Sequence, residues 1–132
     1  MNEKNIKTYT YVCPCCLGKL EECKCGMFPT KLIQIDKNML PIIRELNRKF
    51  FSTETCCEGH IGSNEFMYIE FARKYKFKNP LPKGFEKIGS FIRADITGRT
   101  EQAKKRKKRE LLNRLYQWAC ELESTSINTF IV

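Results

Sequence analysis

The sequence predicts an α+β fold, with a small zinc ribbon or knuckle at the N-terminus followed by a compact sheet covered by two helices. Three observations lead to this class. Five cysteines lie within residues 13–25, short runs rich in aromatic and β-branched residues follow, and two longer segments repeat apolar residues at helical spacing. A chain of 132 residues suits one compact domain with a small appendage. We therefore expect a zinc-binding ribbon over 1–30 and an α+β domain over 31–132.

The first half of the chain is expected to form two strands and a helix. The strands are predicted at 9–12, before the cysteines, and at 31–35. Asp36 is then expected to cap a helix that runs to about Phe50, with Pro41 tolerated because it falls in the first turn. The helical stripe consists of Met39, Ile43, Leu46 and Phe50.

The second half is expected to supply most of the sheet and a long helix. The predicted strands lie at 50–56, 66–71 and 91–96. A loop is expected over 74–84, where prolines and a glycine interrupt the pattern. A helix over about 100–123 follows, and residues 127–132 form either a short edge strand or a loose tail.

The cysteine-rich segment carries the strongest chemical signal. Cys13 and Cys16 have the x-x spacing that clasps one metal ion, and Cys23 and Cys25 supply a second pair. Four thiolates complete a tetrahedron around Zn²⁺, and such a closed site is structural because it keeps no position for water. Cys15 is the alternative to Cys16 as a ligand. The other interpretation is a set of reduced surface thiols without a metal.

The turn after the strand at 50–56 places two cysteines, a carboxylate and the chain's one histidine within residues 56–60. A Cys57/His60 pair has the composition of a nucleophile and its base. Because no third orienting group can be named, we assign no catalytic residue. Cys57-x-x-His60 also has metal-ligand spacing, but it needs two further ligands. The available groups are Cys56, Cys15, Glu58 and Cys120.

Two other interpretations of this turn remain open. The first is a polar or anion-binding pocket, in which backbone N–H groups of the glycines face a phosphate. The residues of this candidate pocket are Cys57, Glu58, Gly59 and His60. The second is structural: a cysteine packs at the strand end, Gly59 makes the turn and His60 forms local hydrogen bonds.

Three short pieces of the chain together resemble the opening motif of the wyosine-tRNA N4-methyltransferase family: Asp36-x4-Pro41, Leu46-Asn47 and Phe51-x-Thr53-x-Thr55-Cys56-Cys57-Glu58-Gly59-His60. In that family a comparable helix leads into a Thr-Thr-Ser-Ser-Cys-Ser-Gly-Arg turn. The chain has Cys56 and Glu58 in place of serines and His60 in place of arginine. The resemblance covers about residues 36–61. It implies a shared helix-strand-turn unit and, as one alternative, an S-adenosylmethionine-dependent RNA-modifying enzyme.

The combination of a Cys-rich N-terminus with Cys57-Glu-Gly-His60 is also similar to short uncharacterised proteins of bacteriophages and mobile elements. This second resemblance implies another alternative, a phage anti-defence inhibitor, for example of the anti-CRISPR type, that binds a nucleoprotein complex.

Basic residues give the chain a formal net charge of +9, and they concentrate in one segment. Residues 99–114 hold eight basic and two acidic residues, which leaves +6. The last helix has an apolar stripe that includes Leu111, Leu115 and Trp118. One and two turns earlier the same stripe would fall on Lys104, Lys107 and Lys108, so we expect the first half of that helix to keep all its charges solvated. The expected nucleic-acid-binding residues are Arg99, Lys104, Lys105, Arg106, Lys107, Lys108, Arg109 and Arg114, with Lys74 and Lys76 from the loop. Tyr75 and Phe77 are expected to offer rings for base stacking.

These observations predict a small zinc-containing basic protein that binds nucleic acid, RNA in preference to DNA. A solvated basic helix without a partner, or a nuclear-import signal, would have the same composition. The first residues lack an apolar signal region and no window is long and apolar enough to span a bilayer. We therefore expect a cytoplasmic protein.

Overall fold

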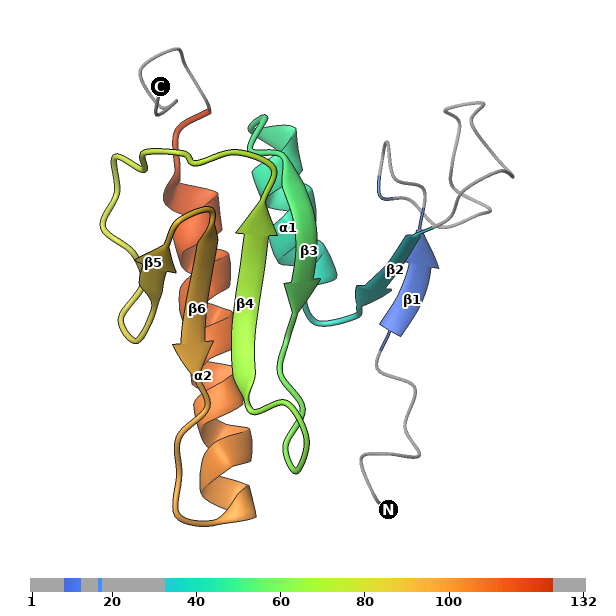
Figure 1. Cartoon of the computed structure of the whole chain (residues 1–132), viewed down its shortest axis with the longest axis vertical. Helices are drawn as coiled ribbons and strands as arrows, with labels where there is room; N and C mark the ends of the chain where they lie inside the picture. Colours follow the sequence, from blue (N-terminus) through green and yellow to red (C-terminus); the bar gives the residue numbers. More distant parts are fainter. Residues whose placement is uncertain (1–8, 13–16, 18–32, 125–132) are drawn as a thin grey trace.

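The computed structural model describes residues 9–12, Leu17 and residues 33–124, and Figure 1 shows their arrangement. The elements in chain order are β1 (Tyr9–Val12), β2 (Ile33–Asp36), α1 (Leu40–Arg48), β3 (Thr53–Cys57), β4 (Phe66–Phe71), β5 (Glu86–Ile88), β6 (Phe91–Asp95) and α2 (Glu101–Glu121). Two helices and two antiparallel sheets confirm the α+β class. The predicted zinc ligands of the ribbon and the alternative ligand Cys15 fall outside the described residues, as does the segment 125–132: these cysteines are Cys13, Cys15, Cys16, Cys23 and Cys25.

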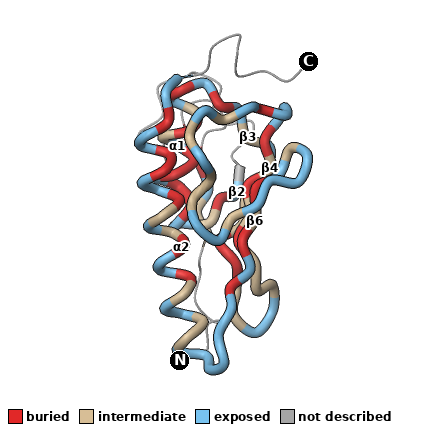
Figure 2. The backbone as a smooth tube through the Cα atoms, turned by 90° about the vertical axis from the view of Figure 1, so that its left-hand side faces the viewer, coloured by how far each residue is buried: buried red, intermediate tan, exposed pale blue. Residues whose placement is uncertain are grey.

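The larger sheet is antiparallel, with strand order β3-β4-β6-β5. Both helices lie on one of its faces, so the domain has one layer of strands and one of helices (Figure 2). Alternation along β4 explains the packing, because Met67 and Ile69 are fully buried toward the helices while Phe66 and Tyr68 are only half-buried on the other face. Leu111 and Leu115 of α2 complete the buried layer. The strands predicted at 66–71 and 91–96 are thereby confirmed.

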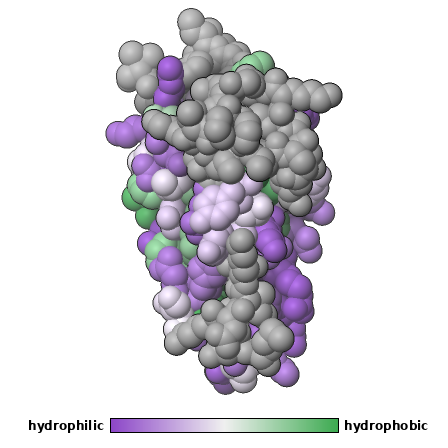
Figure 3. All heavy atoms as spheres, turned by 90° about the vertical axis from the view of Figure 1, so that its right-hand side faces the viewer, coloured by the Kyte–Doolittle hydropathy of each residue, from purple (hydrophilic) through white to green (hydrophobic). Residues whose placement is uncertain are grey.

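The smaller sheet pairs β1 with β2, in a register that places Tyr9 opposite Asp36 and Val12 opposite Ile33. It lies beside β3 in Figure 1. In Figure 3, which views the molecule from this side, hydrophilic side chains predominate over the described surface. The strand β2 ends at Asp36, whose carboxylate reaches the end of β3 and accepts the backbone N–H of Glu58 at 2.9 Å.

The helix α1 starts four residues later than its predicted cap. The N-cap is Met39, whose side chain accepts no hydrogen bond, and the backbone N–H of Met39 donates to the carbonyl of Asp36 at 3.0 Å. Asp36 is therefore part of a tight turn before the helix, and the prediction that its carboxylate caps α1 was wrong. The helix ends at Arg48, and Phe50 has a positive φ of 67° with 71% of its surface exposed.

A further strand, β5, was missed by the sequence analysis. It has three exposed residues and pairs with β6, placing Ile88 opposite Phe91. A two-residue turn at Gly89 and Ser90 joins the two strands, and Gly89 has a φ of 61°. The Gly-Ser pair was the available signal, because such dipeptides connect hairpin strands.

The helix α2 spans most of its predicted range and is held at both ends. Thr100 is the N-cap, and its hydroxyl oxygen accepts the N–H of Ala103 at 3.0 Å. At the other end the buried ammonium of Lys49 donates to the carbonyls of Ala119 and Cys120, at 2.6 Å each. Within the described residues neither helix combines the length and apolar character that a membrane span requires.

Candidate functional site

The turn after β3 is fixed by a glycine that tolerates no side chain. Gly59 has a φ of 85°, and a Cβ at this position would lie 2.4 Å from Cδ1 of Ile96. The chain then closes a loop in which the N–H of His60 donates to the carbonyl of Asn64 at 2.6 Å, and the N–H of Ser63 donates to the carbonyl of His60 at 3.0 Å. This geometry turns His60 back toward the end of β3.

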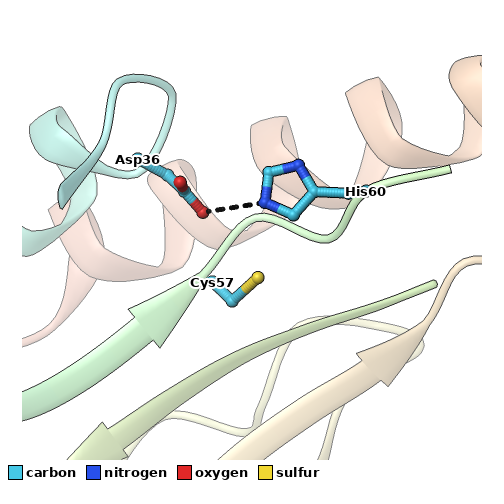
Figure 4. Close-up of side chains that lie close together, drawn as sticks. All are labelled: Asp36, Cys57 and His60. Carbon is cyan, nitrogen blue, oxygen red and sulfur yellow. Dashed lines mark ion pairs between the residues drawn. The ribbon is translucent and has the colours of Figure 1, made fainter. Parts of the chain in front are cut away.

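Asp36, Cys57 and His60 meet at this point (Figure 4), and one ligand atom from each lies within 4.8 Å of the others. Nε2 of His60 is 3.5 Å from Oδ2 of Asp36. The three side chains come from the end of β2, the end of β3 and the following turn. All three are half-buried, with 31% of the His60 side chain and 13% of the Asp36 side chain exposed. Cys57 and His60 were predicted from their spacing in the sequence, whereas Asp36 was not predicted as their partner.

The thiols of this region are poor nucleophiles at neutral pH. Burial raises the pKa of Cys57, and burial together with nearby acidic groups raises the pKa of its neighbour Cys56 to about 12. Sγ of Cys57 accepts contacts from the N–H of Gly59 at 3.4 Å and from Nδ2 of Asn64 at 3.8 Å. Because the thiolate is the reactive form, these surroundings disfavour the interpretation of Cys57 and His60 as nucleophile and base.

The backbone N–H groups of the turn are already engaged. That of Gly59 faces Cys57, that of Ser63 bonds the carbonyl of His60, and that of Gly62 donates to the carboxylate of Glu65 at 3.0 Å. These N–H groups already have acceptors within the chain, which disfavours the interpretation of the glycines as a phosphate cradle.

Glu58 of the candidate pocket faces the interior. Its side chain is fully buried, and Oε2 accepts Nδ2 of Asn38 at 2.7 Å and lies 2.9 Å from Nζ of Lys108. Its backbone N–H is held by the carboxylate of Asp36. Glu58 therefore links the turn to α2, while the accessible groups of the predicted pocket are Cys57 and His60.

The basic half of α2 has an inner and an outer side. On the inner side, Lys108 is only 8% exposed and pairs with Glu58, and Lys104 pairs with Glu65 at 3.0 Å. The expectation that all charges in this half stay solvated was therefore wrong. Lys108 and Lys104 lie one and two helical turns before the buried residue Leu111, on the same side of α2. Each lysine therefore points toward a carboxylate at the end of the sheet.

On the outer side of α2, Lys105, Arg106 and Arg109 are exposed and Lys107 is half-buried. Lys105 pairs weakly with Glu101 at 3.6 Å, and Arg114, further along, lies 3.7 Å from Glu110. In the part of the chain that the structure describes, four basic residues of this region form no ion pair: Arg99, Arg106, Lys107 and Arg109. We call Arg99, Lys105, Arg106, Lys107 and Arg109 the basic face.

Lys74 and Lys76 are exposed but do not adjoin the basic face. The loop that carries them is tied to the far end of α2, where Lys78 pairs with Glu123 at 3.3 Å. That end is roughly 25 Å from the basic face along the helix, at 1.5 Å per residue. Two rings of the same loop were expected to stack on bases, but Tyr75 is 2% exposed and Phe77 packs against Trp118 with 4.9 Å between ring centroids. The stacking prediction was therefore wrong for these rings.

A groove runs beside the basic face. It has a volume of about 470 Å³ and lies between α1 and α2, with Asn38, Pro41, Arg109, Asn113 and Tyr116 among its lining residues. The ring of Tyr116 is 45% exposed. Arg109, Asn113 and Tyr116 recur at positions i, i+4 and i+7 of α2, so they share one side of the helix.

A second cleft, on the sheet face away from the helices, was also missed. It has a volume of about 420 Å³, and its lining includes Phe66, Tyr68 and Phe91. The guanidinium of Arg93 lies 4.3 Å from the ring centroid of Phe66. Alternation in the sequence 66–71 was the available signal. The same face carries the carboxylates of Glu70, Glu86 and Asp95, as the strand register requires.

The fold and the site together define a small basic α+β domain with a cluster of three side chains, Asp36, Cys57 and His60, whose ligand atoms lie close enough to hold a metal ion. Comparison with protein-family models finds no match, and comparisons with curated proteins and with solved structures find none either. The resemblance of residues 36–61 to the wyosine-tRNA N4-methyltransferases stays a prediction.

Proposed function

We propose that the protein binds single-stranded nucleic acid, RNA in preference to DNA, through the basic face and the adjoining groove. The observation that carries this proposal is the separation of cations on α2. Lys104 and Lys108 are neutralised by carboxylates on the inner side. Arg106 and Arg109 are exposed and Lys107 is half-buried, and none of these three forms an ion pair in the described residues. The inner pairs hold the helix on the body, so the outer charges have a fixed spacing.

Clustered cations repel one another, and a polyanion relieves this repulsion while releasing its condensed counterions. Five phosphate contacts would give a slope of log affinity against log salt of about −3.5 for a single strand. Such contacts position the nucleic acid but do not read its sequence.

The groove adds a contact to a base, which the phosphate contacts do not provide. Tyr116 offers an exposed ring two helical turns from Arg109, so a base can stack there while its phosphate contacts the guanidinium. Only an unpaired strand presents a free base face, which favours a single strand over a duplex. The preference for RNA rests on the resemblance of residues 36–61 to a tRNA-modifying family.

The aromatic cleft on the opposite sheet face is less suited to a polyanion. Its rim carries Glu70, Glu86 and Asp95, and Arg93 already pairs with Asp95 at 2.8 Å. Carboxylates beside a phosphate repel it and oppose its binding. We therefore assign nucleic-acid binding to the helix side alone.

The test uses labelled single-stranded RNA, single-stranded DNA and a DNA duplex of mixed sequence, titrated at several salt concentrations. The triple variant Arg106→Ala, Lys107→Ala and Arg109→Ala is expected to lose more than about tenfold in affinity and to flatten the salt slope by about 2. The matched triple Lys74→Ala, Lys76→Ala and Lys78→Ala removes the same number of positive charges from the loop at the far end of α2 and should change affinity less than about threefold.

Two single variants test the groove. Tyr116→Ala should weaken single-strand binding by about 1–3 kcal/mol and leave duplex binding nearly unchanged. Phe91→Ala, in the aromatic cleft, should match the wild type. Equal losses for the two triple variants, or no binding by the wild type at low salt, would overturn the proposal. Retention of one bacterial protein after nuclease treatment would then direct attention to the inhibitor alternative.

A further inference from the structure

Asp36, Cys57 and His60 present three different ligand atoms to one point. Oδ2 of Asp36 and Nε2 of His60 are 3.5 Å apart. Two ligands on one tetrahedral zinc ion, with bonds of about 2.0–2.1 Å, lie roughly 3.3 Å from each other. The observed separation is longer than an ordinary hydrogen bond but close to that of two ligands sharing one ion. The thiol of Cys57 completes a triangle with sides no longer than 4.8 Å.

The surroundings of these atoms support ligand roles. The sulfur of Cys57 receives the N–H of Gly59 and Nδ2 of Asn64, and such contacts stabilise a metal-bound thiolate. The carboxylate of Asp36 accepts the backbone N–H of Glu58 at 2.9 Å, which fixes its orientation. In metal sites of proteins, the side chains that bind the ion are usually oriented by hydrogen bonds from neighbouring groups that do not touch the ion.

The local charge also suits a divalent cation. Asp36 is anionic, and metal binding converts Cys57 to a thiolate, so the two ligands together balance the charge of Zn²⁺. Lys108, whose partner Glu58 is hydrogen-bonded to Asp36 through its backbone N–H, has its charge offset by the carboxylate of Glu58 at 2.9 Å. An imidazole, a thiolate and a carboxylate form a donor set that selects a first-row transition ion over Ca²⁺ and Mg²⁺, which take oxygen ligands.

We propose that Oδ of Asp36, Sγ of Cys57 and Nε2 of His60 bind one Zn²⁺ and leave its fourth position to water or to an added ligand. This is a second site, separate from the four cysteines predicted at 13–25. Three protein ligands with one open position are the arrangement of reactive rather than purely structural zinc. The open position is accessible because about a third of the His60 side chain, 31%, is exposed.

His60 provides a direct reporter because it is the only histidine in the chain. The experiment uses the untagged full-length protein, made metal-free with a chelator under reducing conditions, and follows the imidazole nitrogens by NMR while zinc is added. We expect the Nε2 signal to shift and to saturate. The cysteines at 13–25 do not contribute to this signal, so their own zinc binding cannot produce the result.

Matched variants then identify the ligands. Asp36→Asn keeps a hydrogen-bond acceptor for Glu58, and Cys57→Ser keeps the shape of the side chain. Each should reduce the zinc affinity that His60 reports by more than about tenfold. Cys56→Ala, at the neighbouring cysteine, should retain wild-type affinity.

Cobalt gives an independent readout that needs no change in the imidazole. In a Cys13→Ser, Cys15→Ser, Cys16→Ser, Cys23→Ser and Cys25→Ser background, one equivalent of Co²⁺ should still give a thiolate-to-cobalt absorption band, and this band should vanish on adding Cys57→Ser. Circular dichroism checks that each variant is folded. Unchanged His60 signals at a several-fold excess of zinc, or a cobalt band that survives Cys57→Ser, would overturn the proposal.

Discussion

Nζ of Lys108 lies 2.9 Å from Oε2 of Glu58, and the two side chains are 10% and 1% exposed. This buried ion pair joins the basic half of α2 to the end of β3, beside the cluster of Asp36, Cys57 and His60. It also explains why α2 has two kinds of cation. The lysines that continue the apolar stripe are held by carboxylates, and those on the opposite side remain available to a partner.

Removing one partner of this pair should be costly. Glu58→Gln removes the carboxylate that lies 2.9 Å from the buried ammonium of Lys108, which should lower the free energy of unfolding by about 3–5 kcal/mol. Denaturant unfolding measures the change. The double variant Glu58→Gln with Lys108→Met should recover much of the loss, because neither charge of the pair is then buried.

The control for this prediction is an exposed pair. Asp95→Asn breaks the contact between Arg93 and Asp95, whose side chain is 67% exposed, and should cost less than about 1 kcal/mol. Similar losses for Glu58→Gln and Asp95→Asn would show that the buried pair does not hold α2 in place.

Gly59 and Gly62 offer a second comparison, because both have positive φ, 85° and 90°, but different surroundings. Gly62→Ala meets nothing within 4 Å, so it should cost only the backbone strain of about 1–2 kcal/mol. Gly59→Ala adds a Cβ that would lie 2.4 Å from Ile96 and 3.0 Å from the carbonyl of Phe66. Its cost should exceed that of Gly62→Ala by at least about 1–3 kcal/mol.

Thermal and denaturant unfolding of the two glycine variants give this difference directly. If they were equally stable, the close packing of Gly59 against Ile96 would not constrain the turn. His60 would then lack the rigid support that the proposed metal site requires.

Much of the sheet could be predicted from local patterns. The alternation of residues 66–71 and the apolar stripe of Leu111, Leu115 and Trp118 indicate β4 and α2, because burial on one face imposes a period of two or of 3.6 residues. The strand β5 is only three residues long and exposed, so no apolar pattern marks it. It exists because its backbone pairs with β6.

The site depends on contacts between distant segments, and here local patterns are insufficient. Asp36 has the sequence context of a helix cap, yet it lies at the end of β2 and faces His60, 24 positions later. The burial of Lys108 likewise depends on Glu58, which lies 50 positions earlier in the sequence and faces α2 only in the folded structure. Spacing showed that Cys57 and His60 could act together, but it could not supply their third partner.

The C-terminal end of α2 provides a third prediction, which compares two neighbouring cations that share Glu45. Lys49 is buried and donates to the carbonyls of Ala119 and Cys120, where the helix leaves backbone acceptors unsatisfied. Lys49→Met should therefore lower the free energy of unfolding by roughly 2–3 kcal/mol. Arg48→Met, at a side chain that is 67% exposed, should cost less than about 1 kcal/mol. Chemical denaturation distinguishes these values, and a larger loss for Arg48→Met would contradict the assignment.

A pH dependence of stability is expected from Glu65. The N–H of Gly62 and the ammonium of Lys104 hold the pKa of its carboxyl below the usual value of 4.5. Because the folded pKa is lower than the unfolded one, the ionised carboxylate stabilises the fold above pH 4.5, and this contribution is lost as the pH falls through the folded pKa.

Glu65→Gln removes this contribution, so the variant should melt below the wild type at pH 7, and the gap should close as the pH falls below about 4.5. Melting temperatures measured from about pH 7 to about pH 3 test the prediction. Glu86→Gln is the control, because Glu86 is exposed and forms no ion pair within the described residues. A gap between wild type and Glu65→Gln that stays constant over this range would mean that the carboxylate does not link the turn to α2. The inner lysines would then hold the helix through Glu58 alone.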